Sequence, residues 1–376
     1  MPSGQMISYS NTQPKKRVVT DKILMADVAD RVSLNALGLD NESKFNFVNT
    51  PGEIYEWLED TYADLTDTAN DTGIDSVSTD TTLTVTTGTQ FQVGDVILLD
   101  SEYMLVTGVS TNDLTVTRGY AGTQATHVSN TTVTIVSRAR IEGTASNDSN
   151  FTQATRTSNY SQIFHKEIDI SRTDALLKRY GMADRVDYEL DKAMVELVKL
   201  LDLSLFHAPQ KAGTATTPRG MGRIKTFVTT NKNSLTGTPP LTRKHIDDEL
   251  YDCWLAGGAP DLILTSAWAK RKMSDFYAGF VRTERSEKLG GFEITQLLSP
   301  IDGSVIDVLV DRNCPNDELY ILDSRYVGLI TIDPFFSEEL GKVGDTAYFG
   351  QVVGEYGFVV AFEKAHSYIE DFSTSA

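Results

Sequence analysis

The sequence has few of the features on which secreted, membrane and metal-binding proteins depend. Only two cysteines, Cys253 and Cys314, occur in 376 residues, and their wide separation indicates neither a disulfide framework nor a thiolate metal site. No stretch approaches the roughly 18 uncharged apolar residues of a membrane span, and the first residues contain no apolar run of signal-peptide length. We therefore expect a protein of a reducing compartment with no membrane partner.

Motifs that carry catalytic or cofactor chemistry are also missing. No Walker, GxSxG or dinucleotide-binding motif occurs, and the segment RGMG at 219–222 lacks the third glycine and the upstream strand. The acidic runs at 247–249 and 337–339 favour solvated helix starts or turns over metal sites. Five histidines are isolated in sequence, without ligand spacing, and favour surface or satisfied core positions: His127, His165, His207, His245 and His366. We predict no catalytic residue, metal ion or cofactor.

One short stretch, TVTRGYAGTQATHV at 115–128, could be read as a phosphate-binding or catalytic loop. Gly119, Gly122 and His127 lie close together within it. A phosphate loop needs a helix N-terminus behind its glycines, whereas the sequence on both sides alternates apolar and small polar residues, as strands do. The stretch therefore predicts a turn between strands.

Basic residues are scarce in one part of the chain. The net charge is −18, and residues 51–137 contain thirteen acidic residues against the single Arg118, a net of −12. A general nucleic-acid binder needs a positive face that releases phosphate counterions, so this function class is disfavoured. Within the acidic part, residues 73–137 are rich in Thr, Val, Gly and Asp, and they predict about five short strands in a small barrel or sandwich.

The segments around this unit are extended or helical. Residues 1–45 predict a polar arm with a short helix that ends at Gly38. The arm contains a basic triplet, Lys15, Lys16 and Arg17, which favours a solvated tail over a contact with nucleic acid or an acidic partner. Extended segments at 52–65 and 155–170 flank the acidic unit, which predicts an insertion into a two-stranded excursion.

From Ser171 onward the pattern predicts two helices, and beyond Gly222 it predicts an α+β domain with a central sheet. Ser171 and Asp174 have the spacing of a helix start, with the helix closing at Gly181, and an apolar stripe predicts a long helix from Met182 to His207. Strands and helices then alternate, beginning with a strand in RIKTFVTT, and a long alternating strand with a short one after it ends the chain.

The order of several segments resembles the SU10-like family of tailed-phage major capsid proteins, a branch of the HK97 fold. These segments are YEWLED, NYSQIF running into DISRTDALLKRYGM, then PRGMG, and finally GEYGFVVAFEKAHSYI. The first two contain Trp57 and Tyr160, which together with Lys15, Lys16 and Arg17 are our candidate interaction residues. The resemblance implies the following parts: an N-terminal arm at 1–50, an E-loop at 51–170 with the inserted β-domain, a peripheral domain with a spine helix at 171–221, an axial domain at 222–344, the long peripheral strand at 345–363, and a C-terminal strand and tail at 364–376.

The resemblance also implies partners and a location. Subunits are expected to form pentamers and hexamers of an icosahedral shell in the virion, assembled in the bacterial cytoplasm, with a portal protein, a scaffold and a decoration protein as further partners. Packaged double-stranded DNA would lie nearby without specific contact, which suits the acidic composition. Two alternatives stay open: an encapsulin-like cargo shell, and another phage structural protein such as a tail or decoration protein.

Overall fold

The computed structural model describes residues 32–38, 52–70, 80–138, 142–143, 153–177, 184–276, 281–285, 293–341, 344 and 346–374. The basic triplet of the arm lies outside these residues. The chain divides into two compact units, one formed by 58–156 and the other by 1–57 together with 157–376. Within the described residues, no helix combines the length and apolar character that a membrane crossing requires.

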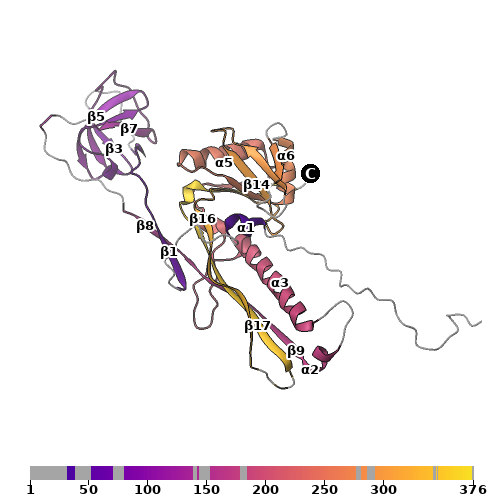
Figure 1. Ribbon diagram of the computed structural model, residues 1–376. Helices are drawn as coiled ribbons and strands as arrows, with labels where there is room; N and C mark the ends of the chain where they lie inside the picture. The colour runs from indigo at the N-terminus through magenta and orange to yellow at the C-terminus, as the bar shows by residue number, and fades with distance from the viewer. Residues whose placement is uncertain are drawn as a thin grey trace, which may run out of the picture. The chain divides into compact units, whose positions relative to one another are not determined.

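A long helix beside a three-stranded sheet forms one part of the larger unit. The sheet has the order β16-β17-β9, all antiparallel, with β9 at Gln162–Ser171, β16 at Val327–Glu339 and β17 at Thr346–Val360. The helix α3, Arg185–His207, begins at the side-chain cap of Asp184 and contacts β9 and β17 (Figure 1). Its buried stripe includes Leu197, Leu201 and Leu205, as the apolar spacing predicted.

A seven-stranded mixed sheet forms the other part of this unit, in the order β10-β18-β15-β11-β14-β13-β12. One face of the sheet shares a core with α3, and the opposite face is covered by α5 and α6 (Figure 1). The elements are β10 Lys232–Ser234, α5 Arg243–Leu255, β11 Leu262–Thr265, α6 Ala267–Phe276, β12 Val281–Arg285, β13 Glu293–Leu298, β14 Val305–Val310, β15 Leu319–Leu322, a 3-10 turn Glu363–Ala365 and β18 Ser367–Glu370.

The smaller unit contains a closed β-barrel of six strands in the order β2-β7-β4-β5-β6-β3. A bridge between Ala69 and Val85 joins the two edges of this sheet, and twelve buried apolar side chains fill the interior. The strands are β2 Thr66–Thr68, β3 Thr82–Thr84, β4 Asp95–Leu99, β5 Glu102–Ser110, β6 Asp113–Thr117 and β7 Thr132–Arg138, with a 3-10 turn at Gly88–Gln90. The all-β insertion is confirmed, with six strands instead of about five and a first strand that begins before residue 73.

Two strands flank the barrel in sequence and pair with each other: β1, Ile54–Glu59, and β8, Thr155–Tyr160. The two-stranded excursion is therefore present, but β8 ends at Tyr160, and β9 continues in a different sheet.

Several local predictions were wrong. The segment RIKTFVTT contains the short helix α4, Ile224–Phe227, and not a strand. The helix at Ser171, α2, covers only Arg172–Leu176 and ends before Gly181. The strand β16 lies in the range expected for the axial domain but pairs with β17, whereas β18, expected as a separate C-terminal strand, joins the seven-stranded sheet. The short helix α1, Val32–Leu37, does end at Gly38 as predicted, with a φ of 105° at the glycine.

Candidate assembly surfaces

The two candidate interaction residues that the structure describes lie at the base of the β1–β8 pair. Trp57 is 8 % exposed, and its ring packs on Phe227 with 5.7 Å between centroids. Tyr160 is half-buried, and its backbone N–H donates a hydrogen bond of 2.8 Å to Asn159 Oδ1. Within one subunit, Trp57 is therefore part of the core that anchors β1.

Asn159, which sequence reasoning missed, connects three segments at this base. It is fully buried, its Nδ2 donates to the Phe358 carbonyl oxygen at 2.7 Å, and its Oδ1 accepts from the Gly222 N–H at 2.9 Å. Each of these polar atoms is satisfied, as burial requires. The side chain therefore holds the β8–β9 corner against β17 and the PRGMG segment.

An ion pair next to Asn159 fixes the PRGMG segment itself. The Arg219 guanidinium pairs with Glu355 on β17, and its Nε donates to the Ser161 carbonyl oxygen at 3.1 Å. The Ser161 hydroxyl donates to Glu355 Oε1 at 2.5 Å. Burial, with Glu355 nearby, raises the pKa of Tyr55 to about 12. The sequence predicted that RGMG is a connector. In the structure, Arg219 binds this connector to Ser161, between β8 and β9, and to Glu355 of β17.

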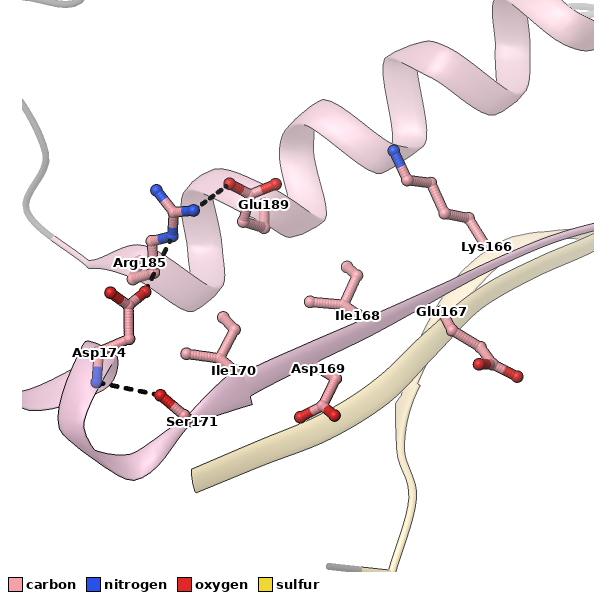
Figure 2. Close-up of a pocket in the computed structure, with 9 residues that line it drawn as sticks. All are labelled: Lys166, Glu167, Ile168, Asp169, Ile170, Ser171, Asp174, Arg185 and Glu189. Carbon is pink, nitrogen blue, oxygen red and sulfur yellow. Dashed lines mark hydrogen bonds and ion pairs between the residues drawn. The ribbon is translucent and has the colours of Figure 1, made fainter. Parts of the chain in front are cut away.

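A pocket of about 540 Å³ lies between β9 and the first turns of α3. Figure 2 shows the alternation of β9, with Ile168 and Ile170 turned toward the helix and Asp169 turned away. Arg185 lies between Asp174 and Glu189, with Nε 3.6 Å and Nη2 3.0 Å from their carboxylate oxygens. The guanidinium is thus neutralised by its own subunit, and it joins α2 to α3 without leaving a cation for an anionic ligand.

The strand β1 has an exposed face on which Glu56 lies between two apolar residues. Its residues alternate between buried and exposed, and Ile54 and Leu58 have 49 % and 71 % of their surface accessible. Among the described residues β1 pairs with β8 in a sheet of two strands. Exposed apolar side chains favour association with another chain.

The stretch with the two glycines is a turn held by a buried carboxylate. Glu102 is fully buried and accepts from Arg118 Nη2 at 2.7 Å and from the N–H groups of Gly119 and Ala125 at 2.9 Å each. His127 lies with Nε2 3.0 Å from Glu102 and Nδ1 2.7 Å from Asp100. Burial alone would raise the pKa of Glu102, but these donors lower it to about 2. The turn that sequence analysis predicted is therefore ordered by a polar cluster that the sequence did not reveal.

The acidic run at 247–249 is only partly solvated. Asp247 and Asp248 form ion pairs with Arg243 and Lys244 one turn earlier on α5. Glu249 is 5 % exposed, and burial raises its pKa to about 7. The expectation of a solvated run was therefore wrong for Glu249. Within the described residues, no group of three or more His, Cys, Asp or Glu side chains has an arrangement that could hold a metal ion.

A sequence profile of the SU10 major capsid protein matches residues 5–373, nearly the whole chain. The chain belongs to the SU10 major capsid protein family. It is a major capsid protein of a tailed phage, a structural component of the virion shell, as the resemblance predicted.

Solved structures show the fold of this capsid protein. The capsid of Myoviridae phage XM1 matches with a TM-score of 0.51 at 10 % identity, over 98 % of this chain and 100 % of that chain. The cyanophage A-1(L) capsid asymmetric unit has a TM-score of 0.42 at 18 % identity, over 63 % and 85 % of the two chains. The holo-SrpI encapsulin complex from Synechococcus elongatus PCC 7942 has a TM-score of 0.47 at 11 % identity, over 59 % and 78 %. The α+β, HK97-like fold is confirmed. Among curated protein sequences, none matches this chain significantly.

Proposed function

We propose that this capsid protein forms pentamers and hexamers of an icosahedral shell, and that its parts have separate roles in that shell. The seven-stranded sheet with α5 and α6 is the axial domain, α3 with β9, β16 and β17 is the peripheral domain, and β1 with β8 is the E-loop. This division replaces the ranges expected from sequence, because β16 and β18 pair across them.

The exposed face of β1 is the observation that carries the E-loop assignment. Ile54 and Leu58 place apolar surface on a two-stranded excursion, and a neighbouring subunit covers this surface in the shell. Trp57 holds the base of the strand in its own subunit. The N-terminal arm, with Lys15, Lys16 and Arg17, reaches a further neighbour and its acidic surface.

The wider context of the shell belongs to the same proposal. The protein has no catalytic role, assembles in the host bacterial cytoplasm, and acts with a portal protein, a scaffold and a decoration protein. Packaged double-stranded DNA lies near it without specific contact, since the excess of acidic side chains repels phosphate. The acidic barrel faces outward, where its charge does not oppose the genome.

Negative-stain electron microscopy of the chain expressed alone, with size-exclusion chromatography, tests self-assembly. We expect closed shells or capsomer rings; a compact monomer at high concentration contradicts unassisted assembly. Deletion of residues 2–30 is expected to leave a folded subunit that forms no stable shells, and normal particles from this deletion would show that the arm is dispensable. Cryo-EM density for the barrel on the inner face would exclude the outward orientation.

A further inference from the structure

Two helices cover one face of the seven-stranded sheet, over opposite parts of it. Ile246 and Leu250 of α5 and Ala269 and Met273 of α6 share one apolar core with this face. The helix α5 contacts β18, next to the edge strand β10, whereas α6 contacts β14, nearer to the opposite edge at β12. Figure 1 shows the two helices at separate positions along the sheet. Two copies placed side by side can therefore bring α5 of one copy to α6 of the other.

The solvent-facing charges of the two helices differ in sign. On α5, ion pairs neutralise Asp247 and Asp248, whereas Asp252 is exposed and has no ion-pair partner within the described residues. The helix α6 contains three basic residues and one acidic residue. Its Arg271 is exposed and likewise has no ion pair in the described part of the chain. Each helix therefore presents an unneutralised charge that the other complements.

Aromatic surface accompanies the unpaired carboxylate. Tyr251 and Trp254 are 50 % and 48 % exposed, and their rings stack with 6.3 Å between centroids and 25° between planes. The next residue, Leu255, is 66 % exposed. Tyrosine and tryptophan are enriched among the residues that dominate binding energy, and charges are depleted from interface cores. The last turns of α5 thus combine an apolar centre with a charged margin, which is the composition of a contact surface.

We propose that α5 of one subunit packs against α6 of the next copy around the capsomer ring. Tyr251 and Trp254 form the apolar anchor, and Asp252 lies opposite Arg271. The inference rests on the proposed assembly into rings. A ring requires a head-to-tail contact between two different patches of each subunit, which two oppositely charged helices provide, whereas a self-complementary patch would produce a two-fold dimer.

Charge reversal with a swap tests this contact. The single variants Asp252→Arg and Arg271→Asp each place like charges in every contact, and we expect the protein concentration needed for assembly to rise about tenfold or more. The double variant carries the swapped pair in every contact and is expected to assemble nearly as the unaltered chain does. Because salt screens the interaction between charges, the variants should differ less in the protein concentration needed for assembly at 1 M salt. A double variant as defective as the singles would overturn the pairing.

Mixing the two single variants before assembly provides a test that depends on ring size. When the two variants alternate around a ring, every contact joins opposite charges, either as the swapped pair or as the native pair. A ring of six can alternate completely. A ring of five must place two copies of one variant side by side, so it retains one like-charge contact. We expect hexamers, flat lattices or open tubes from the mixture in place of closed shells. Random incorporation with no recovery of assembly would contradict the proposal.

Controls separate this contact from the proposed function. Asp64→Arg, at an exposed position of the other compact unit, makes the same charge change outside both helices and is expected to assemble normally. Trp254→Ala is expected to weaken assembly without unfolding the subunit, because its ring is half exposed. If the unaltered chain assembles and Asp252→Arg does too at the same concentration, the contact is refuted and the capsid assignment stands. If the unaltered chain forms no rings, unassisted assembly is contradicted, and with it a ring held by the α5–α6 contact alone.

Discussion

Asn159 Nδ2 donates a hydrogen bond of 2.7 Å to the carbonyl oxygen of Phe358, a residue 199 positions later in the chain. The same side chain accepts from the Gly222 N–H, so one buried amide joins the β8–β9 corner, the PRGMG segment and β17. These are three of the segments that carry the family resemblance. In this structure the three segments therefore close one polar network.

Asn159→Ala is expected to lower the free energy of unfolding of the larger unit by about 2–3 kcal/mol, since two buried backbone groups lose their partner. Chemical denaturation followed by tryptophan fluorescence measures the change. Ser158→Ala is the matched control, because the Ser158 carbonyl oxygen that accepts from Gln210 is unaffected. Equal stability of the two variants would show that water replaces the amide.

Glu102→Gln is expected to destabilise the barrel by about 3 kcal/mol, because it leaves the buried Arg118 without its carboxylate. Hydrogen exchange at the amides of Gly119 and Ala125 should accelerate roughly a hundredfold, while the amides of β17 stay protected. Asp113→Asn, which alters an exposed carboxylate that accepts from Thr84, serves as the control. Unchanged exchange at the two turn amides would contradict the role given to Glu102.

The pH dependence of stability should contain two opposing contributions from residues beside the seven-stranded sheet, one on α5 and one just before β18. Burial raises the pKa of Glu249 to about 7, so the native state retains a proton that the unfolded state releases, and stability falls between about pH 4.5 and 7. Burial lowers the pKa of His366 to about 4, so the unfolded state takes up the proton first, and stability rises from about pH 4 to 6.5. The two contributions nearly cancel over the shared range.

Glu249→Gln removes one of these contributions and should reveal the other. Unfolding midpoints measured from pH 4.5 to 8 are expected to rise steeply to pH 6.5 in this variant and to vary little in the unaltered chain. At pH 8 the variant should be more stable by about 3 kcal/mol. A profile that stays parallel to that of the unaltered chain would show that Glu249 titrates with an ordinary pKa.

Gly88→Ala is expected to destabilise the barrel by about 2–3 kcal/mol, since a Cβ at this position would lie 1.8 Å from the Thr111 carbonyl oxygen and force the backbone to move. Hydrogen exchange in β3 and β6 measures the effect. Gly341→Ala, where nothing lies within 4 Å of the added carbon, is the control, and a barrel that tolerates the first change as well as the second would contradict the prediction.

Periodicity predicted the elements whose side chains repeat regularly against a core. The stripe on α3 and the alternation of β17 were visible because Leu197 and Leu201 recur at helical spacing and Tyr356 and Phe358 at strand spacing. The short helix α4 was read as a strand because Ile224 and Phe227 are too few to define a period. Asn159 and Glu102 were missed because their roles depend on partners brought close only by folding, and a single buried polar residue has no pattern in sequence.

The strands by which the chain enters and leaves the barrel, β2 and β7, pair with each other, as do β1 and β8 on either side of them in sequence. The barrel and the β1–β8 excursion therefore each end in adjacent strands, which lie about 4.8 Å apart in a sheet. The insertion thus requires no rearrangement of either part. This position therefore suits exchange: a module whose ends lie in adjacent strands can replace the barrel while the rest of the chain stays as it is.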